Sequence, residues 1–156
     1  MAIRNILQFG EDTLRKKSRE VTVIDERIIR LVSDLKETMA DARGQGIAAP
    51  QVGILRRVVI VDLEGYGVVE LINPVIVKKS GHQEEIEGCL SYPGEYGITK
   101  RPMKVTVRAL NVDGKRVEYT AEGLGARAIC HEVDHLEGKL FTDVVVRMLD
   151  ADELKD

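Results

Sequence analysis

The segment that most constrains this chain is His131-Glu132-Val133-Asp134-His135, in which two histidines stand four residues apart. Four residues of α-helix turn through about 400°, so both imidazole rings project from one face, one turn apart. Such a pair can hold a divalent metal ion, and the glutamate beside the first histidine can reach a water molecule at the metal without binding the metal itself. The segment therefore predicts a metal-dependent hydrolase and leaves a third metal ligand to be found elsewhere.

The residues around this segment favour a metal site over two histidines that are merely buried and hydrogen-bonded. One stripe of the predicted helix carries Leu124, Ala128, His131 and His135, and the next carries Ile129, Glu132 and Leu136. The histidines therefore emerge from an inward-facing apolar surface. A glutamate on a buried stripe is costly unless it has a partner or a task. Gly138 is a typical helix stop.

Length and composition predict a single domain over residues 1–156, with 150–156 as a charged, frayed tail. The net charge of −3 gives no reason to expect nucleic acid as a partner. No apolar run approaches the ~20 residues of a membrane span, and the N-terminus becomes charged too early for a signal peptide. We therefore expect a cytoplasmic protein without membrane contact, in which Cys89 and Cys130 are thiols.

The hydrophobic pattern predicts an α+β fold. Asp25 is a candidate N-cap for a first helix that runs to about Asp41, and residues 57–121 consist mostly of β-rich runs. Pro74 indicates an edge or a bulge, and residues 111–114 turn the chain into a hairpin. Short antiparallel or mixed sheets should pack around the helix with the histidines, and residues 85–94 should lie between strands.

Two further segments carry candidate site residues. Gly44-Gln45-Gly46-Ile47-Ala48-Ala49-Pro50-Gln51 is rich in small residues, which let the backbone approach a ligand closely, although a plain turn after the first helix explains it as well. Cys89, in Glu87-Gly88-Cys89-Leu90-Ser91, is either a small buried thiol or a metal ligand. With His131 and His135 it would give the three protein ligands of an open catalytic site.

These three segments resemble, in order and at similar spacing, the three signature motifs of peptide deformylases, and the resemblance covers nearly the whole chain. It implies hydrolytic removal of formate from the N-formyl-methionine of new proteins. It also implies one divalent metal ion, Fe(II) first and zinc, nickel or cobalt in a purified sample. The implied ligands are Cys89, His131 and His135.

The resemblance further assigns roles to individual residues. Glu132 becomes the general base and acid, while the Gln51 amide and the Leu90 backbone N–H stabilise the oxyanion. Gly46 pairs its backbone with the substrate, and we assign Gly88 to substrate binding as well.

The methionine side chain requires an apolar slot. From the helical phase we place Leu124 and Ala128 in its wall and Arg127 at its rim, with a contribution from Ile47.

The chain departs from the family pattern at three places. Cys130 stands where members commonly carry glutamine, and we expect it to pack away from the metal. Tyr96 stands where some members carry an arginine that grips the substrate backbone. The tail is shorter than in members that dock on the ribosome through a C-terminal helix. The expected partners are N-formyl-methionyl nascent chains, with the ribosome left open.

Two other classes of metal protein compete with this interpretation. A metallopeptidase would need a third histidine or glutamate ligand, and only Glu137 and Glu153 follow His135. A closed structural metal site would need four ligands, for which Cys130 and His82 are the spare candidates.

Overall fold

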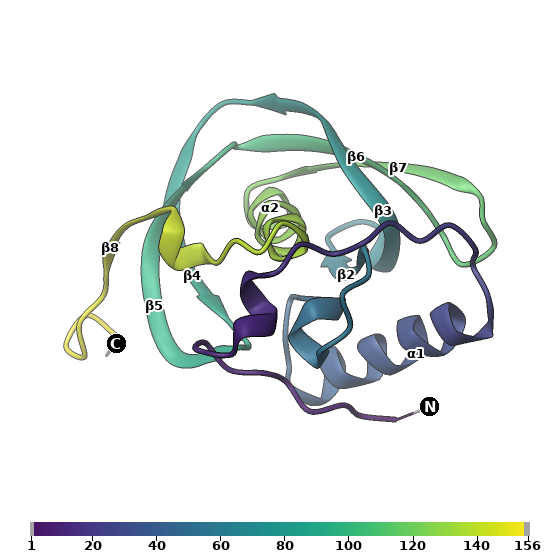
Figure 1. Ribbon diagram of the computed structural model, residues 1–156. Coiled ribbons are helices and arrows are strands. Elements are labelled where there is room, and N and C mark those ends of the chain that lie inside the picture. The colour runs from purple at the N-terminus through teal and green to yellow at the C-terminus, as the bar shows by residue number, and fades with distance from the viewer. Residues whose placement is uncertain (1, 155–156) are drawn as a thin grey trace.

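The computed structural model describes residues 2–154, and the helix that carries the two histidines, α2 (Leu124–Leu136), lies at its centre with strands running around it (Figure 1). The elements before α2 are η1 (Asp12–Arg15), α1 (Glu26–Asp41), β1 (Gly46–Ala48), η2 (Ala49–Val52), β2 (Val58–Leu63), β3 (Gly67–Ser80), β4 (Gln83–Cys89), β5 (Tyr92–Arg101), β6 (Lys104–Leu110) and β7 (Arg116–Glu122). After α2 come η3 (Phe141–Asp143) and β8 (Val145–Met148), where η marks a 3₁₀ helix.

A five-stranded antiparallel sheet in the order β1-β2-β3-β6-β7 separates two apolar cores. Val58 and Ile60 of β2 belong to the core that contains the buried face of α1, whereas Val59 and Val61 belong to the core that contains α2. A strand that is covered on both faces reads as a continuous apolar run rather than an alternating one. This explains why β2 begins with four consecutive β-branched residues.

The predicted irregularity at Pro74 is a bulge in β3. The register against β6 shifts between Ile72 and Val75, and Asn73 adopts the left-handed conformation with φ of 52°. The Asn73 amide donates to the Val21 carbonyl and accepts from the Val21 N–H, both at 2.8 Å. The bulge thereby holds the N-terminal segment against the sheet.

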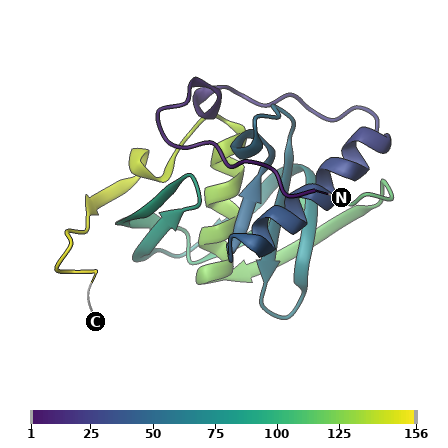
Figure 2. The same ribbon diagram turned by 90° about the horizontal axis from the view of Figure 1, so that it is seen from below.

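A second, three-stranded sheet in the order β4-β5-β8 lies on the other side of α2 (Figure 2). The prediction that residues 85–94 lie between strands is wrong, because they form the end of β4, the tight turn and the start of β5. The polar Glu-Glu-Ile-Glu pattern of β4 concealed a strand whose one face is exposed. Strand β8 was not predicted either, since it is only four residues long and mostly exposed.

Helix α1 begins as expected at Asp25, whose carboxylate accepts a hydrogen bond from the Ile28 N–H at 3.1 Å. Its buried face also contains two polar residues, Asp34 and Thr38. Asp34 accepts from the Ala2 N–H at 2.8 Å and Thr38 accepts from the Arg4 N–H at 2.9 Å. These bonds hold the start of the described chain on α1.

Helix α2 lies between the two sheets and ends at the predicted stop (Figure 2). Gly138 has a φ of 74° and donates to the His135 carbonyl at 3.1 Å. A Cβ at this position would overlap the Arg15 carbonyl, so glycine is required for two reasons.

The α+β class is confirmed, with antiparallel sheets packed around α2 and a second helix near the N-terminus. Within the expected tail, Asp150 and Glu153 form a hydrogen-bonded turn, and Glu153 pairs with Arg147 at 2.7 Å. Residues 155–156 of that tail lie outside the described residues. Among residues 2–154, no helix is both long and apolar enough to cross a membrane.

Candidate active site

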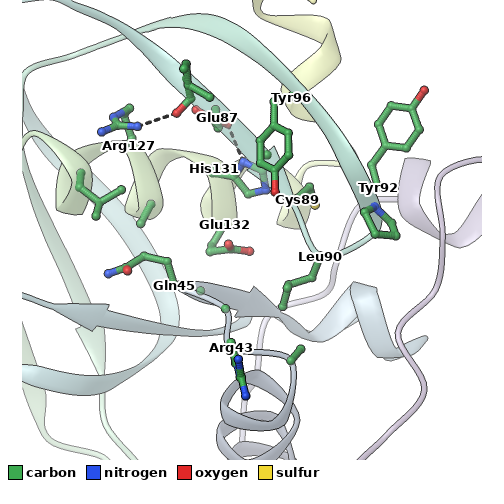
Figure 3. Close-up of a pocket in the computed structure, with 18 of the residues that line it drawn as sticks. Arg43, Gln45, Glu87, Cys89, Leu90, Tyr92, Tyr96, Arg127, His131 and Glu132 are labelled. Atoms are coloured by element: carbon green, nitrogen blue, oxygen red, sulfur yellow. Dashed lines mark hydrogen bonds and ion pairs between the residues drawn. The ribbon is translucent and has the colours of Figure 1, made fainter. Parts of the chain in front are cut away.

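Three potential metal ligands converge at the inner end of β4. His131 and His135 lie one turn apart on α2, with their ring centroids 5.0 Å apart. Cys89 is the last residue of β4 and lies next to His131 (Figure 3). The Cys89 Sγ lies 3.4 Å from His135 Nε2, and one ligand atom from each of the three residues lies within 4.8 Å of the other two. One thiolate and two imidazoles at this separation form a donor set suited to a divalent transition metal.

A local irregularity turns Cys89 towards the helix. The register between β4 and β5 shifts between Gly88 and Cys89, just before the tight turn at Leu90 and Ser91. The Tyr96 ring packs on Gly88 so closely that a Cβ there would lie 2.6 Å from Tyr96 Cε1. The absence of a side chain at Gly88 therefore lets the ring cover the strand beside the cysteine.

A buried charge network holds the first histidine. Glu87 accepts hydrogen bonds from Thr99 Oγ1 at 2.8 Å, from Arg101 Nε at 3.1 Å and Nη2 at 2.7 Å, and from His131 Nδ1 at 2.5 Å. Arg101 also pairs with Asp134 at 2.7 Å. Burial raises the pKa of Glu87, but the bonds from His131 and Arg101 outweigh this and lower it to about 2. The charged carboxylate thus fixes the ring so that Nε2 faces the cysteine.

Glu132 lies beside the ligands and is 4% exposed. Its Oε1 has no hydrogen-bond partner within the described chain, and burial raises the pKa of the carboxyl to about 7. Strand β1 passes so close that a Cβ on Gly46 would lie 2.8 Å from Glu132 Oε2. A buried carboxyl with one unoccupied oxygen and a pKa near neutrality is suited to accept and return a proton.

The Gln51 amide is held in one orientation at the far side of the cysteine. The Ala48 N–H donates to Gln51 Oε1 at 2.9 Å, which directs the NH₂ group towards Ser91 Oγ at 3.1 Å and Cys89 Sγ at 3.5 Å. Gln51 is 1% exposed. A fixed N–H donor therefore lies next to the ligand cluster.

An open cavity of about 530 Å³ gives access to these groups. It lies between β1, the β4–β5 turn and the first half of α2 (Figure 3). Its lining includes Gly46, Gly88, Cys89, Leu90, Leu124, Arg127, Ala128, His131 and Glu132. A substrate can thus reach the cysteine, the first histidine and the glutamate from one side.

The electrostatics of the cluster also favour a cation. Burial opposes a charge on His131, but Glu132, Cys89 and Glu87 raise its pKa well above the ordinary value. Burial and the neighbouring His131 lower the pKa of His135, which leaves it neutral and able to bind a metal. The residues present therefore fit a divalent ion held by Cys89, His131 and His135.

A family model described as polypeptide deformylase matches residues 3–150. The chain belongs to the polypeptide deformylase family. It is 54% identical to a peptide deformylase of Acetivibrio thermocellus over 99% of this chain and 91% of that protein. It is 53% identical to peptide deformylase 1 of Clostridium acetobutylicum over 92% and 95% of the two chains.

Solved structures agree with the assignment to the deformylase family. A peptide deformylase from Legionella pneumophila superposes with a TM-score of 0.87 at 42% identity, over 97% of this chain and 88% of that one. The enzyme from Thermotoga maritima gives 0.87 at 38% identity, over 92% and 97%. Deformylases are metal-dependent hydrolases that remove the N-terminal formyl group from new proteins, and the chain is an enzyme of this class.

The structure brings most of the predicted site residues together, with one correction. Ile47 does not reach the cavity, because its side chain is fully buried in the core that contains α1. Leu124 lines the cavity and is 51% exposed. The helical stripe that was expected to face inward is therefore exposed to solvent at its first residue. Arg127 lines the cavity and donates to the Ile86 carbonyl at 2.8 Å (Figure 3).

The spare ligands of the two competing classes lie elsewhere. Glu137 pairs with Arg57 at 2.5 Å and Glu153 pairs with Arg147, so neither supplies the third ligand of a metallopeptidase. Cys130 is buried in the apolar core beside α2, where burial raises the pKa of its thiol, and His82 is exposed. Within residues 2–154, the ligand cluster consists of three residues and not the four of a closed site.

Sequence reasoning missed the network around Glu87. Glu87 and Asp134 both lie inside the recognised motifs, which indicated that each has a functional role. Their partners Thr99 and Arg101 lie on β5, outside any motif. Pairing them required the register of the β4–β5 hairpin.

Proposed function

We propose that the active site is built from Cys89, His131 and His135 as metal ligands, Glu132 as the proton-transfer group, and Gln51 with the Leu90 N–H as oxyanion donors. The observation that carries this proposal is the convergence of the three ligand atoms within 4.8 Å, next to a buried glutamate with an unoccupied oxygen. When bound, the divalent ion supplies Lewis acidity that polarises a carbonyl and lowers the pKa of water.

The side chains around the ligands account for the proton transfers. Glu132 accepts a proton from the water that attacks the formyl carbon, and it returns the proton to the amine as the C–N bond breaks and formate leaves. Gln51 supports the reaction because its oxygen is held by Ala48 and one N–H by Ser91, and we propose that the other N–H, now 3.5 Å from Cys89 Sγ, turns to donate to the developing oxyanion. Losing one such donor typically costs ~3–4 kcal/mol of transition-state stabilisation.

We propose that the methionine side chain occupies the part of the cavity beside Leu124 and Ala128, with Arg127 at its rim. The peptide that follows extends along the free edge of β1, because β1 pairs with β2 alone in the large sheet. Gly46 offers its backbone at that edge, and Gly88 faces it from β4. Replacement of Leu124 by Trp should narrow the slot and raise KM for formyl-Met peptides.

We propose Fe(II) as the native ion, on the basis of the family resemblance. A thiolate with two imidazoles also accommodates zinc, nickel or cobalt, so the ion found after purification depends on the handling. Anaerobic purification followed by metal analysis tests this assignment, and a full complement of zinc with no iron would reject it. The substrates are formyl-methionyl chains leaving the ribosome, which places the activity in the cytoplasm.

The decisive experiment measures formate release from formyl-Met-Ala-Ser by the wild type and by Glu132→Gln. We expect the variant to keep its metal and to lose at least 100-fold in kcat, since general acid–base catalysis is worth ~10²–10⁴-fold. Glu122→Gln is the matched control, because Glu122 lies at the exposed end of β7. Turnover by Glu132→Gln close to that of the control would reject the role of Glu132.

A further inference from the structure

Two arginines stand at the rim of the cavity on different sides of Glu132, at Arg43 and Arg127 (Figure 3). In the part of the chain that the structure describes, neither guanidinium has a carboxylate within 4.0 Å. Arg127 donates to neutral acceptors only, the Gln83 amide oxygen at 2.9 Å and the Ile86 carbonyl at 2.8 Å. Arg127 therefore brings an uncompensated positive charge to the entrance, and Arg43 carries one at the end of α1, where its side chain points away from Glu132 in Figure 3.

The negative groups inside the cavity do not cancel this charge. Glu87 is already neutralised by Arg101 and His131. Glu132 lies deeper, beside the cluster that fits a divalent cation, and Cys89 is a member of that cluster. Among the charged residues that line the cavity, the two arginines are thus the ones whose charge is not balanced by a partner.

The backbone of Arg43 is fixed although its side chain is exposed. The residue has a φ of 56°, its N–H donates to the Ala40 carbonyl at 3.1 Å, and the next N–H, of Gly44, donates to the Met39 carbonyl at 2.9 Å. Arg43 therefore has a defined place at the end of α1, three residues before Gly46 at the edge of β1. The point from which this exposed, positively charged side chain extends is therefore fixed.

The path of the peptide brings its later residues to Arg43. With the methionine side chain beside Leu124 and Ala128, as proposed above, the following residues would run along the edge of β1 past Gly46 towards Arg43. An extended peptide advances about 3.3 Å per residue, so three residues cover about 10 Å along β1. Arg43 stands three positions before Gly46, with Gly44 and Gln45 between them, so the residues after methionine have the reach to approach it.

We propose that Arg43 is a specificity-determining residue that makes this site favour formyl-methionyl chains with an acidic side chain shortly after the methionine over chains with a lysine there. This inference rests on the proposed function, since it assumes that a formyl-methionyl peptide occupies the cavity. The contact is exposed to solvent, so the preference is modest and weakens as salt screens the charges.

The test uses formyl-Met tetrapeptides that carry Glu, Gln or Lys at one of the three positions after methionine, with Ala or Ser elsewhere. At low salt, the wild type should show a Glu-to-Lys ratio of kcat/KM of about fivefold or less at the best position, mainly through KM. The ratio should approach one in 0.5 M salt. Arg43→Lys should keep it, Arg43→Gln should abolish it and Arg43→Glu should reverse it.

Arg30→Gln is the matched control. Arg30 is exposed on α1, so this substitution removes the same charge at a site about 20 Å from Arg43 along the helix axis. Each ratio is measured within one variant, so a partial loss of folded protein cancels. A wild-type ratio of one, an unchanged ratio in Arg43→Gln, or an equal change in Arg30→Gln would overturn the inference while turnover of the Gln peptides still supports the proposed function. If no formyl peptide is turned over, the proposed function fails and this inference fails with it.

Discussion

Replacement of Glu87 by Gln tests the charge network that holds the first histidine. Both carboxylate oxygens are occupied, one by Thr99 and Arg101 Nε, the other by Arg101 Nη2 and His131 Nδ1. A glutamine keeps the shape but has one acceptor oxygen. In either orientation of the amide, its NH₂ group takes the place of one carboxylate oxygen. The two donors that bonded to that oxygen, one of them an N–H of Arg101, then lose their acceptor.

The size of the effect follows from burial and charge. Hydrogen bonds that involve charged groups contribute about 1.5–3 kcal/mol each, so losing two costs about 3–6 kcal/mol. Removing one partner of a buried ion pair costs a similar ~3–5 kcal/mol, because Arg101, 6% exposed, keeps its charge. Loss of an outer partner of a metal-binding histidine typically weakens metal affinity ~10–100-fold.

Two measurements check this prediction: urea unfolding at pH 7, and cobalt(II) titration of the metal-free protein. Glu84→Gln is the control, because Glu84 lies on the same strand and its 3.6 Å pair with Lys100 is largely exposed. Such a pair contributes at most ~1 kcal/mol. If Glu87→Gln matches Glu84→Gln in both stability and cobalt affinity, the network does not hold His131 and the reasoning is wrong.

Two further predictions concern a close approach and a buried carboxylate. In Gly46→Ala the new Cβ would meet Glu132 Oε2 at 2.8 Å and Cγ at 2.9 Å, so the carboxylate must move; we expect kcat for formyl-Met-Ala-Ser to fall at least ~10-fold with the metal retained, and unchanged kcat would contradict the contact. Burial raises the pKa of Asp34, but the bonds from Ala2 and Arg4 outweigh it and place the pKa below the ordinary 3.8. The stability that Asp34 contributes is therefore complete above the unfolded-state pKa and is lost as the pH falls through the folded-state value. Urea unfolding of wild type and Asp34→Asn should show the largest difference at pH 7 and a shrinking one below pH ~4; a constant difference would count against the ion pair.

The parts of the site that lie close together in sequence were predictable. Helical spacing alone placed His131 and His135 on one face and Glu132 beside them, and Gly138 marked the end of the helix. Cys89, the third ligand, precedes His135 by 46 residues in the sequence. Its selection depended on the number of ligands an open metal site requires and on the family resemblance, because no periodicity connects a strand end with a helix face.

Ile47 shows why the remainder could not be predicted. Strand β1 has three residues and all three are buried, so hydrophobicity does not reveal which face each occupies. Ala48 belongs to the core beside α2, whereas Ile47 belongs to the core beside α1. A strand shifted by one residue exchanges its two faces, and only the pairing of β1 with β2 sets that register.

The structure explains why two positions of the motifs, 46 and 88, are glycine, which the sequence alone did not. The small residues around Gly46 were expected to let the backbone approach a ligand, yet the group nearest to Gly46 is the Glu132 side chain of the same protein. Gly88 likewise leaves room for the Tyr96 ring. Neither glycine has a φ in the left-handed region, so close approach and not backbone conformation explains both. Strand β1 therefore confines the carboxylate of Glu132 before any substrate arrives, and a group confined in advance needs less reorganisation during the reaction.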